Sequence, residues 1–124
     1  MSKRANGSAG DDRINRVVEF IHKNYSEKID VRRLASDVFM ETNHFIKVFK
    51  KHIGLTPYQY IKDYRLAVAS DMLKRGAKVK AAAQAAGYMS VSAFSNAYKK
   101  RLGIYPGTVY EIKKQAELEK YKKI

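Results

Sequence analysis

The chain has 124 residues, a length that suits one domain or two small units with a shared core. It has no cysteine, which excludes disulfides and thiolate metal sites, and no apolar run approaches the roughly 18 residues of a membrane span. Lysine and arginine number 25 against 12 aspartate and glutamate residues, and the net charge of +13 favours a polyanionic partner. A basic protein without such a partner and a protein that binds the membrane surface are the alternatives.

One long stretch in the second half of the chain has basic residues and no acidic ones. No aspartate or glutamate occurs between Asp71 and Glu111. The basic residues in that stretch are Lys74, Arg75, Lys78, Lys80, Lys99, Lys100 and Arg101. This clustering favours nucleic acid as the partner.

The first half of the chain predicts three helices after a short leader. Residues 1–10 are small, polar and rich in glycine and serine, which is typical of a flexible leader or the remnant of a linker. Apolar spacing predicts a helix at about 11–25, a short helix that Asp30 can cap, and a third at about 42–53 that ends at Gly54. The apolar residues expected to face the core are Ile14, Val17, Val18, Ile21, Val31, Leu34, Ala35, Val38, Phe45, Val48, Phe49 and Ile53.

The second half predicts four more helices. A long helix begins at Thr56-Pro57, with a capping hydroxyl and a proline in the first turn, and ends near Arg75. An alanine-rich helix follows at about 79–86, then a helix at about 91–102 that Ser90 can cap, and a last helix that Pro106 opens. The residues expected in this core are Ile61, Leu66, Ala69, Met72, Leu73, Phe94, Ala97, Tyr98 and Leu102.

The sequence contains an internal repeat. Residues 45–57 read FIKVFKKHIGLTP and residues 94–106 read FSNAYKKRLGIYP, with Phe, Lys, Lys, Gly and Pro identical at an offset of 49. Upstream, residues 34–35 align with residues 82–83 at an offset of 48, so the second copy has one extra residue in its turn. Because a solenoid needs about three copies, two copies separated by a long helix indicate a duplicated module.

Each copy follows the helix-turn-helix plan, in which the second helix enters the major groove of DNA. The first helix packs through small residues, so the second can cross it closely. The second helix buries an aromatic pair and leaves its N-terminal half free for base edges. Basic residues at its C-terminal end can reach phosphates. These predicted phosphate contacts are Lys50, Lys51, Lys99, Lys100 and Arg101.

The stretch FKKHIGLTPYQYIKDYRLAVASDML, followed by GYMSVSAFSNAYKKRLGIYP, resembles the DNA-binding domain of the AraC/XylS family over about residues 14–110. The residues that fit the family pattern are Arg65, Leu66, Ala69, Met72, Leu73, Gly87, Tyr88, Ser92, Phe94, Ser95, Tyr98, Lys99, Gly103 and Pro106. The resemblance implies seven helices, two recognition helices in successive major grooves, and usually transcription activation. Three residues depart from the pattern: Phe39 replaces a turn glycine, Tyr110 replaces an arginine, and Asn96 replaces a frequent basic residue.

The resemblance also implies which residues read bases. Carried over position by position, they are Asn43, Ile46, Lys47, Val91, Ser92, Ser95 and Asn96. Lys47 could read guanine, Asn43 or Asn96 could read adenine, and Val91 could touch a thymine methyl group. In the first copy the helical period independently places Asn43, Ile46, Lys47 and Lys50 on one stripe, opposite the aromatic pair.

We therefore predict an all-α chain with a leader at 1–10, a first helix-turn-helix unit at 11–56, a linker helix at 57–76, a second unit at 77–112 and a basic helical tail at 113–124. The predicted function is sequence-specific binding of double-stranded DNA as a transcription regulator, in most family members an activator. The alternative is a nonspecific architectural nucleic-acid-binding protein, which the specificity ratio at fixed salt would distinguish.

No enzyme, cofactor or metal site is predicted. His44 and His52 are eight residues apart on one helix, roughly 12 Å, whereas zinc binds its ligands at about 2.1 Å. His22 does not complete a metal-binding motif with these two residues. No catalytic triad, phosphate-binding glycine loop or carboxylate pair is evident. A protein-interaction module would need an exposed apolar patch, but we expect the core to use every apolar stripe.

The resemblance implies partners beyond double-stranded DNA. These are RNA polymerase and a sensing or dimerisation domain outside this chain. We expect no membrane partner and a cytoplasmic, nucleoid-associated location. Whether the chain is a piece of a longer regulator or a free-standing member of the family is left open.

Overall fold

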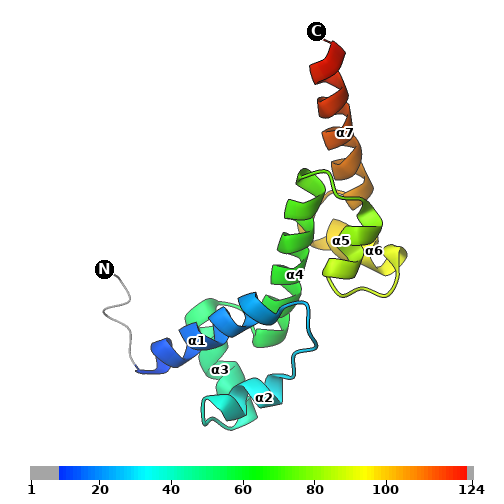
Figure 1. Cartoon of the computed structure of the whole chain (residues 1–124). Helices are drawn as coiled ribbons and strands as arrows, with labels where there is room; N and C mark the ends of the chain where they lie inside the picture. Colours follow the sequence, from blue (N-terminus) through cyan, green and yellow to red (C-terminus); the bar gives the residue numbers. More distant parts are fainter. Residues whose placement is uncertain (1–8, 123–124) are drawn as a thin grey trace. The chain divides into compact units, whose positions relative to one another are not determined.

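A computed structural model describes residues 9–122, and the part of the chain that it describes consists of seven α-helices without a strand (Figure 1). The helices are α1 (Ala9–Asn24), α2 (Val31–Asp37), α3 (Thr42–Ile53), α4 (Pro57–Lys74), α5 (Val79–Ala85), α6 (Val91–Leu102) and α7 (Pro106–Lys122). The expected all-α class is therefore confirmed. The helix α1 begins two residues inside the predicted leader, whose residues 1–8 lie outside the described part.

The chain divides into two compact units between Lys62 and Asp63. Each unit has its own hydrophobic core, and α4 contributes to both. Ile61 is buried in the first core, whereas Leu66 and Leu73 are buried in the second. The segment predicted as a separate linker helix is thus also a wall of each core.

Unit 1 packs α1, α2, α3 and the start of α4 around two aromatic rings. Phe45 and Phe49 are fully buried, with their ring centroids 5.8 Å apart. The other buried apolar residues are Ile14, Val17, Ile21, Val31, Leu34, Ala35, Val38 and Ile61. Val18, Val48 and Ile53, which we expected in the core, are only partly buried at its edge.

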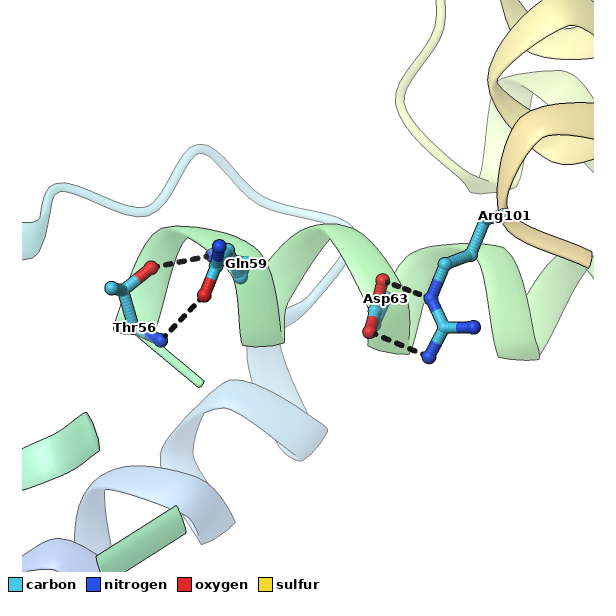
Figure 2. A network of polar contacts seen from close by, with 4 residues as sticks. All are labelled: Thr56, Gln59, Asp63 and Arg101. Carbon is cyan, nitrogen blue, oxygen red and sulfur yellow. Dashed lines mark hydrogen bonds and ion pairs between the residues drawn. The ribbon is translucent and has the colours of Figure 1, made fainter. Parts of the chain in front are cut away.

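Local caps explain where several helices begin. The Asp30 carboxylate accepts a hydrogen bond from the backbone N–H of Arg32 and caps α2. At the start of α4, the hydroxyl oxygen of Thr56 accepts from the N–H of Gln59 at 3.2 Å. The side-chain oxygen of Gln59 accepts in return from the N–H of Thr56 at 3.0 Å (Figure 2). This reciprocal capping box satisfies two otherwise unpaired donors.

Unit 2 packs α5, α6 and α7 against the remainder of α4. Its core contains one aromatic pair, Phe94 and Tyr98, with ring centroids 5.5 Å apart. Ala82, Ala83 and Ala86 are buried beside them, and these small side chains let α5 approach α6 closely.

Met72 and Ala97, which we expected in the core, are only half-buried. The prediction for Leu102 is wrong, because Leu102 is 41% exposed. It is the last residue of α6 and lies on the wall of an apolar groove of about 520 Å³. The groove is lined by Ser70, Lys74, Tyr98, Leu102, Ile104, Val109, Ile112, Lys113 and Ala116. The helix α7 continues through residues 113–122 of the predicted tail. Because the groove leaves apolar residues of α6 and α7 open, the expectation that the core uses every apolar stripe is wrong.

Candidate nucleic-acid interface

In unit 1, α3 separates its two faces clearly. Phe45 and Phe49 point into the core, whereas Asn43 and Lys47 are exposed. Ile46 is different, because it is half-buried and packs against the edge of the core. The first half of the helix therefore presents one amide, one ammonium group and part of one aliphatic side chain to a partner.

In unit 2, α6 repeats this arrangement with shorter side chains. Phe94 and Tyr98 are buried, while Val91, Ser92 and Asn96 are exposed and Ser95 is half-buried. The helix therefore exposes one small aliphatic group, hydroxyls and an amide at its start. These groups can make apolar contacts with thymine methyl groups and hydrogen bonds with base edges.

The two recognition helices have different N-caps. In α6, the Ser90 hydroxyl accepts from the N–H of Ala93 at 3.1 Å. In α3, the Glu41 carboxylate accepts from the N–H groups of Asn43 at 3.1 Å and His44 at 3.0 Å. These backbone hydrogen bonds lower the pKa of Glu41 below its ordinary value. Sequence reasoning missed this cap, although Glu41 aligns with Ser90 at the repeat offset of 49.

Most predicted phosphate contacts lie at the exposed C-terminal ends of α3 and α6. Lys50, Lys51 and Lys100 are exposed. Lys99 is also exposed, but its ammonium group donates to the carbonyl oxygen of Gly103 at 3.0 Å and lies 5.3 Å from the centre of the Tyr105 ring.

Arg101 differs from the lysines beside it. Its Nε and Nη2 donate to the two carboxylate oxygens of Asp63, each at 2.9 Å (Figure 2). Such a bidentate pair fixes the guanidinium geometry, and the hydrogen bonds raise the pKa of Arg101 above its ordinary value. The pair joins the end of α6 to α4 within unit 2.

The turns between the helices of each pair have the same backbone geometry. In unit 1, the N–H of Phe39 donates to the carbonyl of Ser36 and that of Met40 donates to the carbonyl of Ala35, each at 3.0 Å. In unit 2, the N–H groups of Gly87 and Tyr88 make the corresponding bonds to Gln84 and Ala83, also at 3.0 Å. Both are Schellman turns, which need a left-handed residue at their centre.

The left-handed residue is Phe39 in one turn and Gly87 in the other, with φ angles of 57° and 83°. The backbone keeps the glycine-type turn, so Phe39 is strained. Arg13 supports this turn by donating from Nη1 to the carbonyl of Val38 at 3.0 Å.

Among residues 9–122, no three histidine, cysteine, aspartate or glutamate side chains lie together in a way that could hold a metal ion. None of the helices in the same residues is long and apolar enough to cross a membrane.

Comparison with known proteins places this geometry in a family. A family model described as a helix-turn-helix domain matches residues 34–111, which is more than half of the chain. The chain belongs to the AraC-type helix-turn-helix family. The family and the fold are those of DNA-binding regulators and not of enzymes.

Two regulators illustrate the sequence similarity. A probable transcriptional regulator, LumQ of Photobacterium leiognathi, is 33% identical over 98 residues, which cover 77% of this chain and 40% of LumQ. The XylDLEGF operon transcriptional activator of Pseudomonas putida is 29% identical over 113 residues, which cover 87% of this chain and 35% of that protein. The chain therefore spans well under half the length of these relatives.

Solved structures share the fold. An AraC-type transcriptional regulator from Chromobacterium violaceum matches with a TM-score of 0.77 and 20% identity, over 86% of this chain and 96% of that chain. The DNA-binding domain of AdpA, in complex with a target DNA, matches with a TM-score of 0.73 and 24% identity, over 81% of this chain and 91% of that chain.

Proposed function

We propose that this AraC-type domain binds a specific double-stranded DNA sequence as part of a transcription regulator, an activator. The observation that carries the proposal is the duplicated geometry of α3 and α6. Each helix buries an aromatic pair at equivalent positions and exposes a different set of residues in its first half. Two helices with the same buried positions but different exposed residues suit a protein that distinguishes two different base clusters.

The proposed base contacts are Asn43, Ile46 and Lys47 in α3 and Val91, Ser92, Ser95 and Asn96 in α6. If each helix enters a successive major groove, the two base clusters lie about one helical turn apart, roughly 34 Å. The site should then be asymmetric and bipartite, and one protein molecule should suffice to fill it.

The decisive experiment is selection of binding sites from random DNA at fixed salt. The parent, Lys47→Ala and Asn96→Ala should be compared. We expect Lys47→Ala to relax base preference in one cluster only and Asn96→Ala in the other only, each by about 1–3 kcal/mol where the contact is direct. A nonspecific architectural protein would enrich no site, and a palindromic site would contradict the two-reader proposal.

The further partners belong to the whole protein. Because the similar regulators are much longer than this chain, we propose that the domain acts with a sensing or dimerisation domain and with RNA polymerase at the nucleoid. Transcription from a promoter that carries the selected site, with and without the protein, tests activation. A fall in transcript would indicate a repressor.

A further inference from the structure

Each helix-turn-helix turn exposes one large apolar side chain just before its recognition helix. Phe39 is 91% exposed and lies two residues before the N-cap Glu41. Met89 is fully exposed and immediately precedes the N-cap Ser90. The two residues are not equivalent in the repeat, because Gly87 is the counterpart of Phe39, but both lie in the short segment between the turn and the N-cap of a recognition helix.

Phe39 carries a conformational cost that the fold does not offset. It is the one residue other than glycine with a positive φ angle among residues 9–122. A left-handed conformation costs a residue with a Cβ roughly 1–2 kcal/mol. Because the ring is almost completely exposed, it gains no burial within unit 1, and Gly87 forms the same turn without a side chain.

Strain that no intramolecular contact offsets is typical of functional positions. The turn leads directly into the first half of α3, the part of unit 1 to which we assign base reading. DNA offers two apolar surfaces there: the methyl group of thymine in the major groove and the carbon atoms of deoxyribose. An exposed phenyl ring or a methionine side chain can bury itself against either.

We propose that Phe39 and Met89 make apolar contacts with DNA, one beside each recognition helix. The inference rests on the proposed function and adds to it a contact from each turn. Phe39 contributes to the half-site of unit 1 and Met89 to that of unit 2. The conformational strain at Phe39 is then offset only in the complex.

The test uses the duplex that the parent selects, with Lys47→Ala and Asn96→Ala marking which half-site belongs to which unit. The variants are Phe39→Gly, which keeps the turn, and Met89→Ser, which changes a fully exposed side chain. Tyr121→Ser, at another exposed apolar residue on α7, is the matched control.

We expect each turn variant to bind its selected site roughly fourfold to fifteenfold more weakly, as the loss of one or two buried methyl groups would predict. Phe39→Gly should reduce only the contribution of the first half-site, and Met89→Ser only that of the second. Tyr121→Ser should bind like the parent.

Replacing thymine by uracil in one half-site distinguishes the two DNA surfaces. If Phe39 touches a thymine methyl group, the parent loses affinity on this replacement and Phe39→Gly does not. If it touches deoxyribose, Phe39→Gly binds both duplexes equally weakly. Binding within twofold of the parent by Phe39→Gly and Met89→Ser overturns the inference while the parent still selects its site. A parent that selects no site overturns the proposed function as well.

Discussion

The Asp63–Arg101 pair leads to a quantitative prediction about DNA affinity. Three basic residues end α6, but only Arg101 has its charge matched by a carboxylate at 2.9 Å. The logarithm of the binding constant falls with the logarithm of salt concentration by about 0.9 for each phosphate neutralised. We therefore expect Lys100→Ala to reduce this slope by about 0.9 and Arg101→Ala to leave it unchanged.

The assay is a titration of labelled duplex at four or more salt concentrations, with the parent and both variants on one DNA. Asp63→Asn is the complementary variant, because it removes the paired carboxylate and frees Arg101 for the duplex. It should steepen the slope by up to about 0.9. Lys100→Ala should have the larger effect on the salt slope, whereas Arg101→Ala should have the larger effect on stability in chemical denaturation, because only Arg101 joins α6 to α4. An equal loss of slope in Lys100→Ala and Arg101→Ala would refute this reasoning and make Arg101 a phosphate contact.

Four further predictions concern stability. Phe39→Gly should raise the free energy of unfolding by about 0.5–1 kcal/mol, because relief of left-handed strain exceeds the greater backbone entropy lost by glycine. Gly87→Ala should lower it by about 1 kcal/mol, and urea melts compare the two changes directly. Glu41 has a folded-state pKa below its unfolded value, so its stabilisation is present above the unfolded pKa and is lost as pH falls through the folded pKa. Melts of the parent and Glu41→Gln between pH 3 and 7 should converge at the acid end, and a constant difference would contradict the cap. Phe94→Ala should destabilise unit 2 by about 3–5 kcal/mol in thermal melts, because its ring is fully buried.

The helices could be predicted well because their signals are local. Pro57 and Pro106 open helices, and Gly54 and Gly103 end them with φ angles of 94° and 81°. A cap or a stop depends on residues within one turn of itself, so the sequence contains the whole signal. The internal repeat also predicted that the second helix of each copy buries an aromatic pair at equivalent positions.

Long-range contacts were harder to predict. The run Lys99-Lys100-Arg101 has one chemical character in the sequence, but the partner of Arg101 lies 38 residues away on α4. Nothing local marks Asp63 as that partner. Leu102 fits the apolar period of α6, yet it is the last residue of the helix and lines an open groove. The helical period predicts on which face of a helix a residue lies, whereas its burial also depends on which other helices cover that face.

Acidic residues suggest that the two units contribute differently to binding. Arginines in both units pair with carboxylates of their own unit, but of the two recognition helices only α3 has a carboxylate, that of Glu41, as its N-cap. In unit 2, no acidic residue occurs from the end of α4 to the start of α7. Because a carboxylate beside a phosphate is repelled, the salt-dependent attraction should come mainly from unit 2. Unit 1 has longer reading side chains, and Glu41 opposes nonspecific association there. We therefore expect unit 1 to contribute more to discrimination between sequences than to affinity.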